Sequence, residues 1–482
     1  MWEADLFTAI AVGALVLAVY HYIAKRYQYF LTKPVPCVKP TFLLGSSMPL
    51  LIRDRDISSY IRTLYDAYPD AKMVGFYHLT QPVYMLRDPE TIKTITVKDF
   101  DHFTDHTPTM AGTSEEAKTG KRLELEMKDT FTRFGNDVIA TVAFGIKVDS
   151  MRDRENDFYM KGKQLTNFER FAVIFKVMLM SAMPSLANKL GVDLVDAEAA
   201  KYFTEMIMEN MKQRKAHGIV RNDMIQMLME VRKGALRHDE SEKDTKDAGF
   251  ATVEESKVGK STHSRIWKDN ELLGQCFIFF FAGFETVSTG LTFLTYELAL
   301  NPEIQQRLYE EVMDTESNLD GKPLTYETLQ KMQYMDMVIS ESLRKWPPAV
   351  LADRYCTRDY HYKDSVGSFV IEKGKSVWIP SIAIHNDPRY YPNPEKFDPE
   401  RFSEENRANI NPYAYMPFGA GPRNCIGSRL ALMEMKLIVY YLLRDFSLEP
   451  TERTQIPLRL VMNGFNLQSE KGVWLEFNPR SL

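Results

Sequence analysis

The sequence is poor in features that would place it in several common classes. Its 482 residues contain only four cysteines, widely and irregularly spaced, which is unlike a disulfide framework and favours a reducing compartment. It contains no internal repeat, no nucleotide-binding glycine fingerprint and no basic stripe with interleaved aromatic residues. These absences argue against a built-in nucleotide site and against a nucleic-acid partner. The net charge of −5 does not indicate a partner.

One of the four cysteines has a setting that suits a metal ligand. Cys425 lies in the run 417–427, which reads Pro-Phe-Gly-Ala-Gly-Pro-Arg-Asn-Cys-Ile-Gly. The three glycines of this run, Gly419, Gly421 and Gly427, permit positive φ and close backbone approach, so N–H groups can point at the sulfur. The run therefore predicts a protected thiolate that holds a metal ion.

Two neighbouring features agree with this prediction. Phe418 can cover the sulfur from water, and apolar periodicity from Ile426 to Ile438 predicts a helix whose N-terminus stabilises a thiolate. The simpler alternative, a buried structural cysteine in a glycine-rich turn, is preferred for the other three cysteines, Cys37, Cys276 and Cys356.

The run around Cys425 resembles the haem-binding segment of the cytochrome P450 superfamily. The resemblance covers nearly the whole chain and is closest to animal, particularly insect, detoxification-type members, as in the sequence Arg-Lys-Trp-Pro-Pro at 344–348. It implies a mainly α fold with a small β region, and haem b whose axial ligand is the Cys425 thiolate. A lone thiolate also pushes electron density onto iron and favours O–O cleavage.

A second motif lies in a long apolar segment. Residues 268–300 predict a helix roughly 50 Å long at about 1.5 Å per residue, apolar nearly all round in its first half and therefore buried there. Thr286 can donate a hydrogen bond to the carbonyl of Ala282 beside Gly283, which opens a groove. In the family, this groove lies on the distal haem face and admits dioxygen, and Glu285 with Thr286 relays protons.

A third set of residues forms a predicted brace. Glu341 and Arg344 are three residues apart on a helix that ends before Pro347, and alone they would be an ordinary surface ion pair. The resemblance adds Arg401 and implies a buried network that supports the cysteine loop.

The resemblance also implies contacts to haem and to substrate. The two haem propionates require cationic or hydrogen-bonding partners, for which Arg354, His385 and Arg423 are the candidates. An apolar pocket is expected from Phe281, Ala282, Thr286, Val350, Leu351 and the segment from Met462 to Phe465.

The remaining pattern is mostly helical. Helices are expected at 196–212 and 223–231, with a charged loop at 234–260. Short strands are expected at 366–371, 376–379 and 473–477.

The N-terminus predicts attachment to a membrane. The mostly apolar stretch Leu6 to Ile23 is followed by basic residues, which favours a retained anchor with a cytosolic body over a cleaved signal peptide. The expected organisation is an anchor at 1–24, a basic and proline-rich tether at 25–44, and a catalytic domain at 45–482. The resemblance implies the cytoplasmic face of the endoplasmic reticulum membrane.

One family feature is missing. The expected Trp-x-x-x-Arg helix, which reaches a propionate, is absent, because no tryptophan lies between Trp2 and Trp267. The loss maps near 106–120, and a splice form, a faulty gene model and a natural deletion all remain open. His106, Lys121 and Arg122 are possible substitutes for the lost contact.

The main hypothesis is a monooxygenase that inserts one atom of O2 into lipophilic small molecules, such as xenobiotics, insecticides or endogenous lipids. NADPH-cytochrome P450 reductase is the expected electron donor, with cytochrome b5 as an additional partner, and Lys436 is a candidate docking residue. Two alternatives remain: a haem-thiolate isomerase, and an impaired or silent variant that binds haem or sequesters the reductase because of the missing segment.

Overall fold

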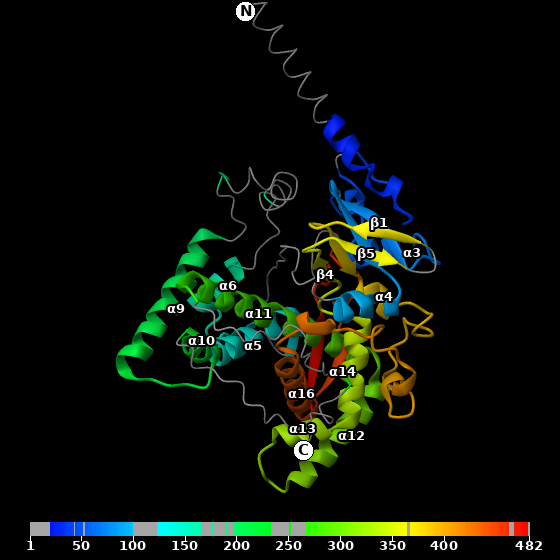
Figure 1. The fold of residues 1–482 in the computed structure, drawn as a ribbon. Coiled ribbons are helices and arrows are strands. Elements are labelled where there is room, and N and C mark those ends of the chain that lie inside the picture. The colour runs from blue at the N-terminus through cyan, green and yellow to red at the C-terminus, as the bar shows by residue number, and fades with distance from the viewer. Residues whose placement is uncertain are drawn as a thin grey trace, which may run out of the picture.

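The described residues form a mainly helical fold with three small sheets (Figure 1). The computed structural model describes residues 20–42, 44–51, 54–99, 123–165, 176, 189–190, 196–232, 250–251, 267–363, 367–461 and 467–480. Within these residues, the predicted class of a mainly α protein with a small β region is confirmed. Most of the predicted anchor, all of 106–120 and most of the 234–260 loop lie outside them.

The elements in these ranges have the following bounds. The helices are α2 (Met48–Leu51), α3 (Ile57–Asp66), α4 (Pro89–Lys93), α5 (Met127–Val142), α6 (Asp157–Leu165), α9 (Ala197–His217), α10 (Met224–Arg232), α11 (Asp269–Leu300), α12 (Pro302–Leu319), α13 (Tyr326–Lys331), α14 (Gln333–Lys345), α15 (Ser381–His385) and α16 (Ser428–Asp445). Short helical turns are η1 (Tyr29–Thr32), η2 (Thr94–Lys98), η4 (Pro399–Phe402), η5 (Arg407–Asn409) and η6 (Gly421–Arg423). The strands are β1 (Met73–His78), β2 (Gln81–Leu86), β3 (Leu123–Glu126), β4 (Ala352–Tyr355), β5 (Tyr360–Lys363), β6 (Ser368–Ile371), β7 (Ser376–Ile379), β8 (Phe446–Pro450) and β9 (Trp474–Pro479).

The largest sheet joins strands from distant parts of the chain. Its order is β1-β2-β7-β4, with β2 parallel to β7 and the other pairs antiparallel. A second sheet has the order β3-β9-β8, and β5 pairs with β6 in a hairpin. The predicted strands at 376–379 and 473–477 correspond to β7 and β9, and the strand expected at 366–371 is found as β6.

The long helix α11 spans the centre of the molecule. Its bounds agree with the predicted helix, but the burial differs from the prediction. The second half, Val287–Ala299, is continuously buried, whereas Ile278 in the first half is 60% exposed. Among the described residues, only Glu271–Leu300 is long and apolar enough to cross a membrane, and its packing places it in the domain core.

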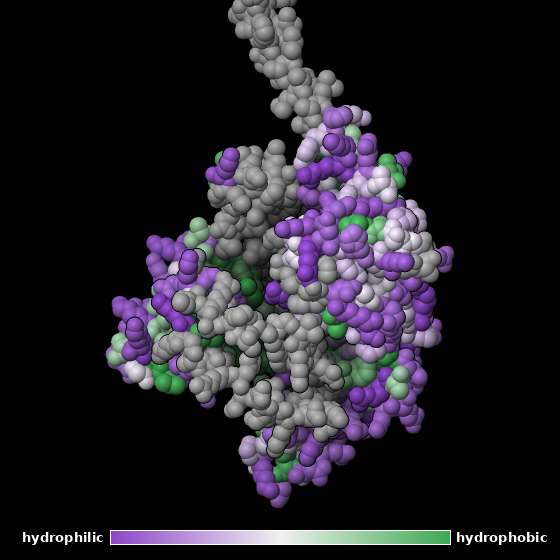
Figure 2. All heavy atoms as spheres, in the orientation of Figure 1, coloured by the Kyte–Doolittle hydropathy of each residue, from purple (hydrophilic) through white to green (hydrophobic). Residues whose placement is uncertain are grey.

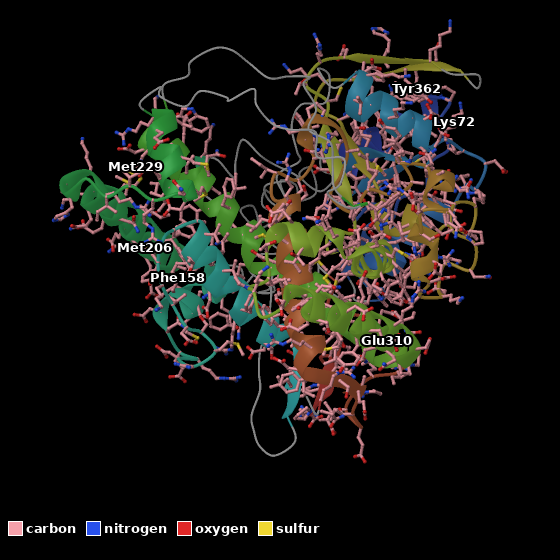
Figure 3. All side chains as sticks on the ribbon, turned by 90° about the horizontal axis from the view of Figure 1, so that it is seen from below. Lys72, Phe158, Met206, Met229, Glu310 and Tyr362 are labelled. Atoms are coloured by element: carbon pink, nitrogen blue, oxygen red, sulfur yellow. The ribbon has the colours of Figure 1, made fainter. Side chains whose placement is uncertain are left out.

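The helices near residue 200 begin where polar side chains satisfy free backbone N–H groups. Asp196 caps α9 by accepting hydrogen bonds from the N–H groups of Glu198 and Ala199. Both α9 and α10 match the helices expected at 196–212 and 223–231. Figure 3 shows Phe158, Met206 and Met229 on one side of the molecule, and Lys72 with Tyr362 on the opposite side.

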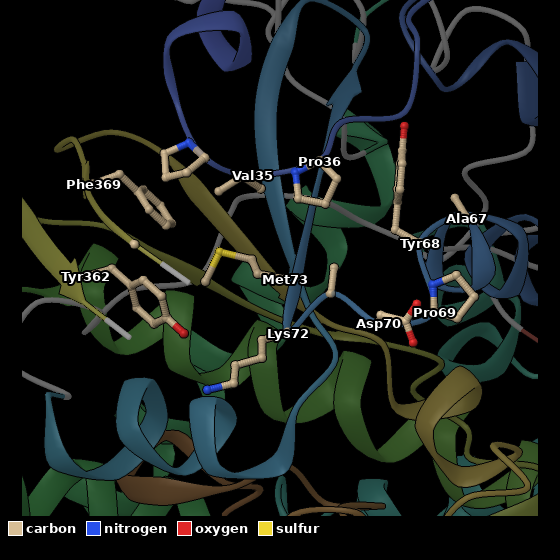
Figure 4. Close-up of a pocket in the computed structure, with 13 residues that line it drawn as sticks. Val35, Pro36, Ala67, Tyr68, Pro69, Asp70, Lys72, Met73, Tyr362 and Phe369 are labelled. Atoms are coloured by element: carbon tan, nitrogen blue, oxygen red, sulfur yellow. The ribbon is translucent and has the colours of Figure 1, made fainter. Parts of the chain in front are cut away.

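The proline-rich segment predicted to be a tether packs against the domain. Pro36 accepts a hydrogen bond from the N–H of Gly75 in β1, and the N–H of Val38 donates to the carbonyl of Gly75. Val35 is buried, so this segment adds a short extended edge to the sheet instead of acting as a free spacer. Beside it lies a pocket of about 390 Å³, lined by Val35, Pro36, Met73, Tyr362 and Phe369 among others (Figure 4).

Candidate functional site

The Cys425 side chain is presented on a short loop directly before α16. Its thiol is exposed, and its N–H donates to the carbonyl of Phe418 at 2.9 Å, which closes the loop. Desolvation by the surrounding loop raises the pKa of Cys425, and a hydrogen bond from the N–H of Gly427 opposes this rise. The sulfur lies three residues before the first residue of α16, where helical N–H groups favour negative charge.

Two of the glycines have the backbone conformation that the loop requires. Gly419 and Gly421 have φ of +76° and +75°. A Cβ on Gly421 would lie only 2.0 Å from the carbonyl oxygen of Thr96, so this glycine lets the loop pack against η2. Gly427 has a φ of −92° and so does not use positive φ, but its N–H hydrogen-bonds the Cys425 sulfur, as the sequence analysis expects.

Two arginines lie near the cysteine loop. Arg354 on β4 is buried and donates to the carbonyl of Ala420 at 2.9 Å, while Arg423 on η6 is exposed. Burial lowers the pKa of Arg354 to about 10, although Asp353 opposes this shift and Arg423 adds to it. The Nε of Arg354 has no hydrogen-bond partner among the described residues. This pair of cations suits an anionic group.

The first half of α11 presents an exposed stripe. Ile278, Ala282 and Thr286 follow one another at four-residue intervals, so they share one helix face, and all three are exposed. The hydroxyl of Thr286 donates to the carbonyl of Ala282 at 2.7 Å, as the sequence suggested. Figure 2 shows a hollow with hydrophobic atoms between the part of the chain that carries α6 and α9 and the part that carries β1.

The acid next to Thr286 has a partner that the sequence analysis missed. The ammonium of Lys128, on α5, lies 2.7 Å from the Glu285 carboxylate. It also donates to the hydroxyls of Ser288 and Thr289 at 2.8 and 2.9 Å. A polar pocket of about 350 Å³, lined in part by Lys128 and Thr289, opens beside this pair. No local sequence signal links α5 to α11 across more than 150 residues.

Gly283 lies where α11 needs space. A Cβ at this position would lie 2.6 Å from Cδ1 of Ile139 on α5. The absent side chain therefore lets α5 pack closely along α11, and the role of Gly283 in the groove beside Thr286 stays a prediction.

The predicted brace residues are brought together. Arg344 binds Glu341 through two hydrogen bonds of 2.7 and 2.9 Å, and both side chains are fully buried. The Nε of Arg401 lies 3.5 Å from the same carboxylate, which also accepts a hydrogen bond from the N–H of Asp398. Arg344 donates further to the carbonyl of Pro394. The network therefore joins α14 to the chain that leads toward Cys425.

His385 is a fully buried, neutral histidine. Burial, reinforced by Arg344, lowers the pKa of His385 to about 3. Its Nε2 accepts a hydrogen bond from the N–H of Met416 at 2.8 Å, and its ring stacks against Tyr415, so it supports the segment before the cysteine loop. A neutral ring is not a cationic partner for a propionate. Its Nδ1 has no hydrogen-bond partner among the described residues, so its role as a hydrogen-bonding partner of haem stays a prediction.

The predicted pocket residues are divided between the core and the site. Val350 is buried in the core around the largest sheet, with Leu351 packed against that core, while Phe281 is partly buried near α9. Met462 and Phe465 lie outside the described residues, as do His106, Lys121 and Arg122.

The prediction that Lys436 belongs to a docking surface is wrong. Its side chain is fully buried, and its ammonium lies 3.3 Å from Asp336. The remaining cysteines differ in exposure: Cys276 and Cys356 are buried as expected, and Cys37 is partly exposed.

Comparison with known proteins identifies the family. The cytochrome P450 family model matches residues 110–475. Probable cytochrome P450 9f2 of Drosophila melanogaster is 37% identical over 539 aligned positions that cover all of both chains. Cytochrome P450 9e2 of Blattella germanica is also 37% identical, over 98% of this chain and 97% of the relative. The chain belongs to the cytochrome P450 family.

Cytochrome P450s are haem monooxygenases whose iron is bound by a cysteine thiolate, so the chain is an oxidoreductase of that class. The described residues fit haem. Cys425 offers an exposed thiol, and Arg354 keeps an unpaired Nε beside Arg423, as two buried propionates require. No group of three or more His, Cys, Asp or Glu in the described part of the chain suits a metal ion.

The comparison also bears on the missing segment. The alignment to the Drosophila P450 has 539 positions, more than the 482 residues of this chain, so the relative contains segments that this chain lacks. The match to the family model begins at residue 110, within the region to which the sequence analysis assigns the loss.

Proposed function

We propose that this P450 is a membrane-anchored monooxygenase that inserts one oxygen atom from O2 into lipophilic small molecules, with Cys425 as the iron ligand. The observation that carries the proposal is the exposed Cys425 thiol at the start of α16, a helix that packs against α11. NADPH-cytochrome P450 reductase supplies the electrons, and cytochrome b5 is an additional donor. The anchor at the N-terminus holds the domain on the cytoplasmic face of the endoplasmic reticulum.

Haem, when bound, supplies the iron at which dioxygen is activated. The residues of this chain hold the cofactor and move protons. Arg354 and Arg423 would hold the propionates, and the Glu341–Arg344–Arg401 network supports the chain that leads to the cysteine loop. The hydrogen bond from Thr286 to Ala282 fixes the hydroxyl on the exposed stripe of α11.

Proton supply involves the Lys128–Glu285 pair. Lys128 and Thr289 both line the polar pocket of about 350 Å³, so water can approach the pair from that side. Lys128 holds the Glu285 carboxylate at 2.7 Å, and Thr286 is the next residue on α11. We infer that protons pass from the pocket to Glu285 and then to the Thr286 hydroxyl.

The exposed apolar stripe favours oily substrates. Ile278 and Ala282 offer no hydrogen-bonding group, so they select by shape and hydrophobicity. Xenobiotics, including insecticides, and endogenous lipids fit this description. A second candidate function, a haem-binding variant with impaired catalysis, is favoured by the segments that relatives have and this chain lacks.

Turnover with labelled dioxygen tests the proposal. The purified full-length protein is combined with the reductase, NADPH, a lipophilic test substrate and isotopically labelled O2. The proposal predicts a product that contains one labelled oxygen atom and depends on NADPH. NADPH consumption without product supports the impaired variant, and product without labelled oxygen indicates an isomerase.

A further inference from the structure

Two residues between α10 and α11 lie against the chain that leads to the cysteine. Phe250 is partly buried, and Ala251 is only 3% exposed. Both pack with the core cluster that contains α12, α14 and α16. This part of the sequence is rich in charge, so a buried apolar pair within it requires a specific packing site.

The backbone of Phe250 is held by a buried charge pair. Its N–H donates to Oδ2 of Asp336, in the first turn of α14, at 2.7 Å. The other oxygen of Asp336 lies 3.3 Å from the buried ammonium of Lys436 on α16. The contact therefore ties the α10–α11 connection to two helices of the domain core.

The ring of Phe250 lies among aromatic side chains. Its centroid is 5.0 Å from that of Phe402 and 5.2 Å from that of Tyr415, and the Arg407 guanidinium lies 5.6 Å from it. Phe402 belongs to η4, directly after the brace residue Arg401. The ring therefore joins both ends of the segment that runs from η4 to the cysteine loop.

Tyr415 connects Phe250 to the segment that leads to Cys425. Its hydroxyl donates to the carbonyl of Ser340 on α14, and its ring stacks on His385. The next residue, Met416, donates its N–H to His385 and accepts a hydrogen bond from the N–H of Gly419. Gly419 lies within the loop that the Cys425–Phe418 hydrogen bond closes.

We propose that Phe250 is a positioning residue for the cysteine loop. Its ring holds Tyr415, and Tyr415 in turn fixes the backbone at Met416 and the start of the loop. This inference rests on the proposed role of Cys425 as the iron ligand. It predicts that a residue in the connection between α10 and α11 affects thiolate ligation by Cys425.

The test uses the haem-bound protein and three variants: F250A, F250L and F369A. F250A removes the ring, and F250L keeps an apolar side chain without it. F369A is the control. It removes a partly buried ring in β6 that contacts the rings of Tyr84 and Tyr362, and neither of these residues belongs to the cysteine segment. The carbon monoxide spectrum of the ferrous protein distinguishes a thiolate ligand from a neutral thiol ligand. The rate at which the thiolate spectrum disappears is measured in mild urea. Hydrogen exchange is measured for peptides from residues 413–425.

Loss of two aromatic contacts predicts that F250A loses the thiolate spectrum roughly tenfold faster than the native protein, with a smaller effect for F250L. Hydrogen exchange of residues 413–425 should increase most in F250A and less in F250L. F369A should match the native protein in both the spectral measurement and the hydrogen exchange. The proposal is overturned if F250A and F369A behave alike. If F250A does not fold, F250L with native exchange and native spectral stability overturns it. A native holoprotein without any thiolate spectrum overturns the proposed function itself.

Discussion

The ammonium of Lys128 and the carboxylate of Glu285 are 2.7 Å apart, and their side chains are only 17% and 16% exposed. The pair joins α5 to α11 at the residue before Thr286, whose hydroxyl lies on the exposed stripe. A carboxylate in this setting needs its cation, because a partly buried charge without a partner is costly. Lys128 lines the polar pocket and holds the Glu285 carboxylate beside it.

Substituting Lys128 with methionine tests this role. In K128M, Glu285 loses its charged partner at a cost of roughly 1–3 kcal/mol, so we expect the yield of product per NADPH to fall about tenfold. The yield is measured with the reconstituted reductase. K161M is the control, since Lys161 pairs at 2.6 Å with an exposed carboxylate, Glu198, on the surface. Equal yields in K128M and K161M would refute a role for Lys128 in proton supply.

The buried brace predicts a large loss of stability. E341Q leaves the Arg344 and Arg401 guanidinium groups without their carboxylate, and we expect the free energy of unfolding to fall by about 3–5 kcal/mol. Urea unfolding followed by circular dichroism measures the change. R62Q removes an exposed pair, Arg62 with Glu395 at 3.1 Å, and should cost less than about 1 kcal/mol. Similar losses in the two variants would show that burial of the brace contributes little.

The packing at Gly283 predicts opposite effects for two glycines of the same helix. G283A places a Cβ within 2.6 Å of Ile139 and should destabilise the protein by about 1–3 kcal/mol. A Cβ at Gly274 meets nothing within 4 Å, so G274A should stabilise α11 by up to about 1 kcal/mol.

A double variant separates the clash from other causes. I139A removes the two closest atoms that the new Cβ would meet, Cδ1 at 2.6 Å and Cγ1 at 2.9 Å, so I139A/G283A should be less destabilised than the sum of the single variants. Thermal unfolding of all four proteins provides the comparison. Strict additivity would mean that the contact with Ile139 is not the reason for a glycine at 283.

Glu434 on α16 predicts a dependence of stability on pH. It is buried, and burial raises the pKa of Glu434 from 4.5 to about 7. As pH rises from about 4.5 to about 7, the unfolded chain loses this proton while the folded chain keeps it, so stability falls by up to roughly 3 kcal/mol. Above about pH 7, this loss in the free energy of unfolding stays constant.

E434Q removes this titration. The variant should match the native protein near pH 4.5 and be more stable at pH 8, as urea midpoints across that range would show. E405Q, at an exposed glutamate, should follow the native curve at every pH. Parallel curves for E434Q and the native protein would contradict the assignment.

Local motifs allowed much of the site to be predicted. Cys425, the Glu341–Arg344 pair and Thr286 each stand in short motifs, which were enough to single them out. The structure confirms the contact between Glu341 and Arg344 and the hydrogen bond from Thr286 to Ala282. Arg401 was also placed beside Glu341, through the family pattern. Helix α11 was predicted because its segment is long and apolar nearly all round in its first half, and β7 and β9 because they are short β-like runs.

The residues that were missed or wrongly placed depend on packing between distant segments. Lys128 approaches Glu285 only because α5 lies along α11. Lys436 looked like a surface lysine, but Asp336 from α14 gives it a buried partner. His385 is neutral because the fold buries it fully, a property that no local pattern encodes.

The most direct test of the account is the carbon monoxide difference spectrum of the C425A protein. The native protein should bind haem and show the thiolate-type spectrum, and C37A, which removes a partly exposed cysteine elsewhere, should retain it. C425A should lose that spectrum and all monooxygenase turnover, because Cys37 is only partly exposed and lies outside the cysteine loop, and Cys276 and Cys356 are buried. A C425A protein with an unchanged Soret band and undiminished turnover would contradict the account.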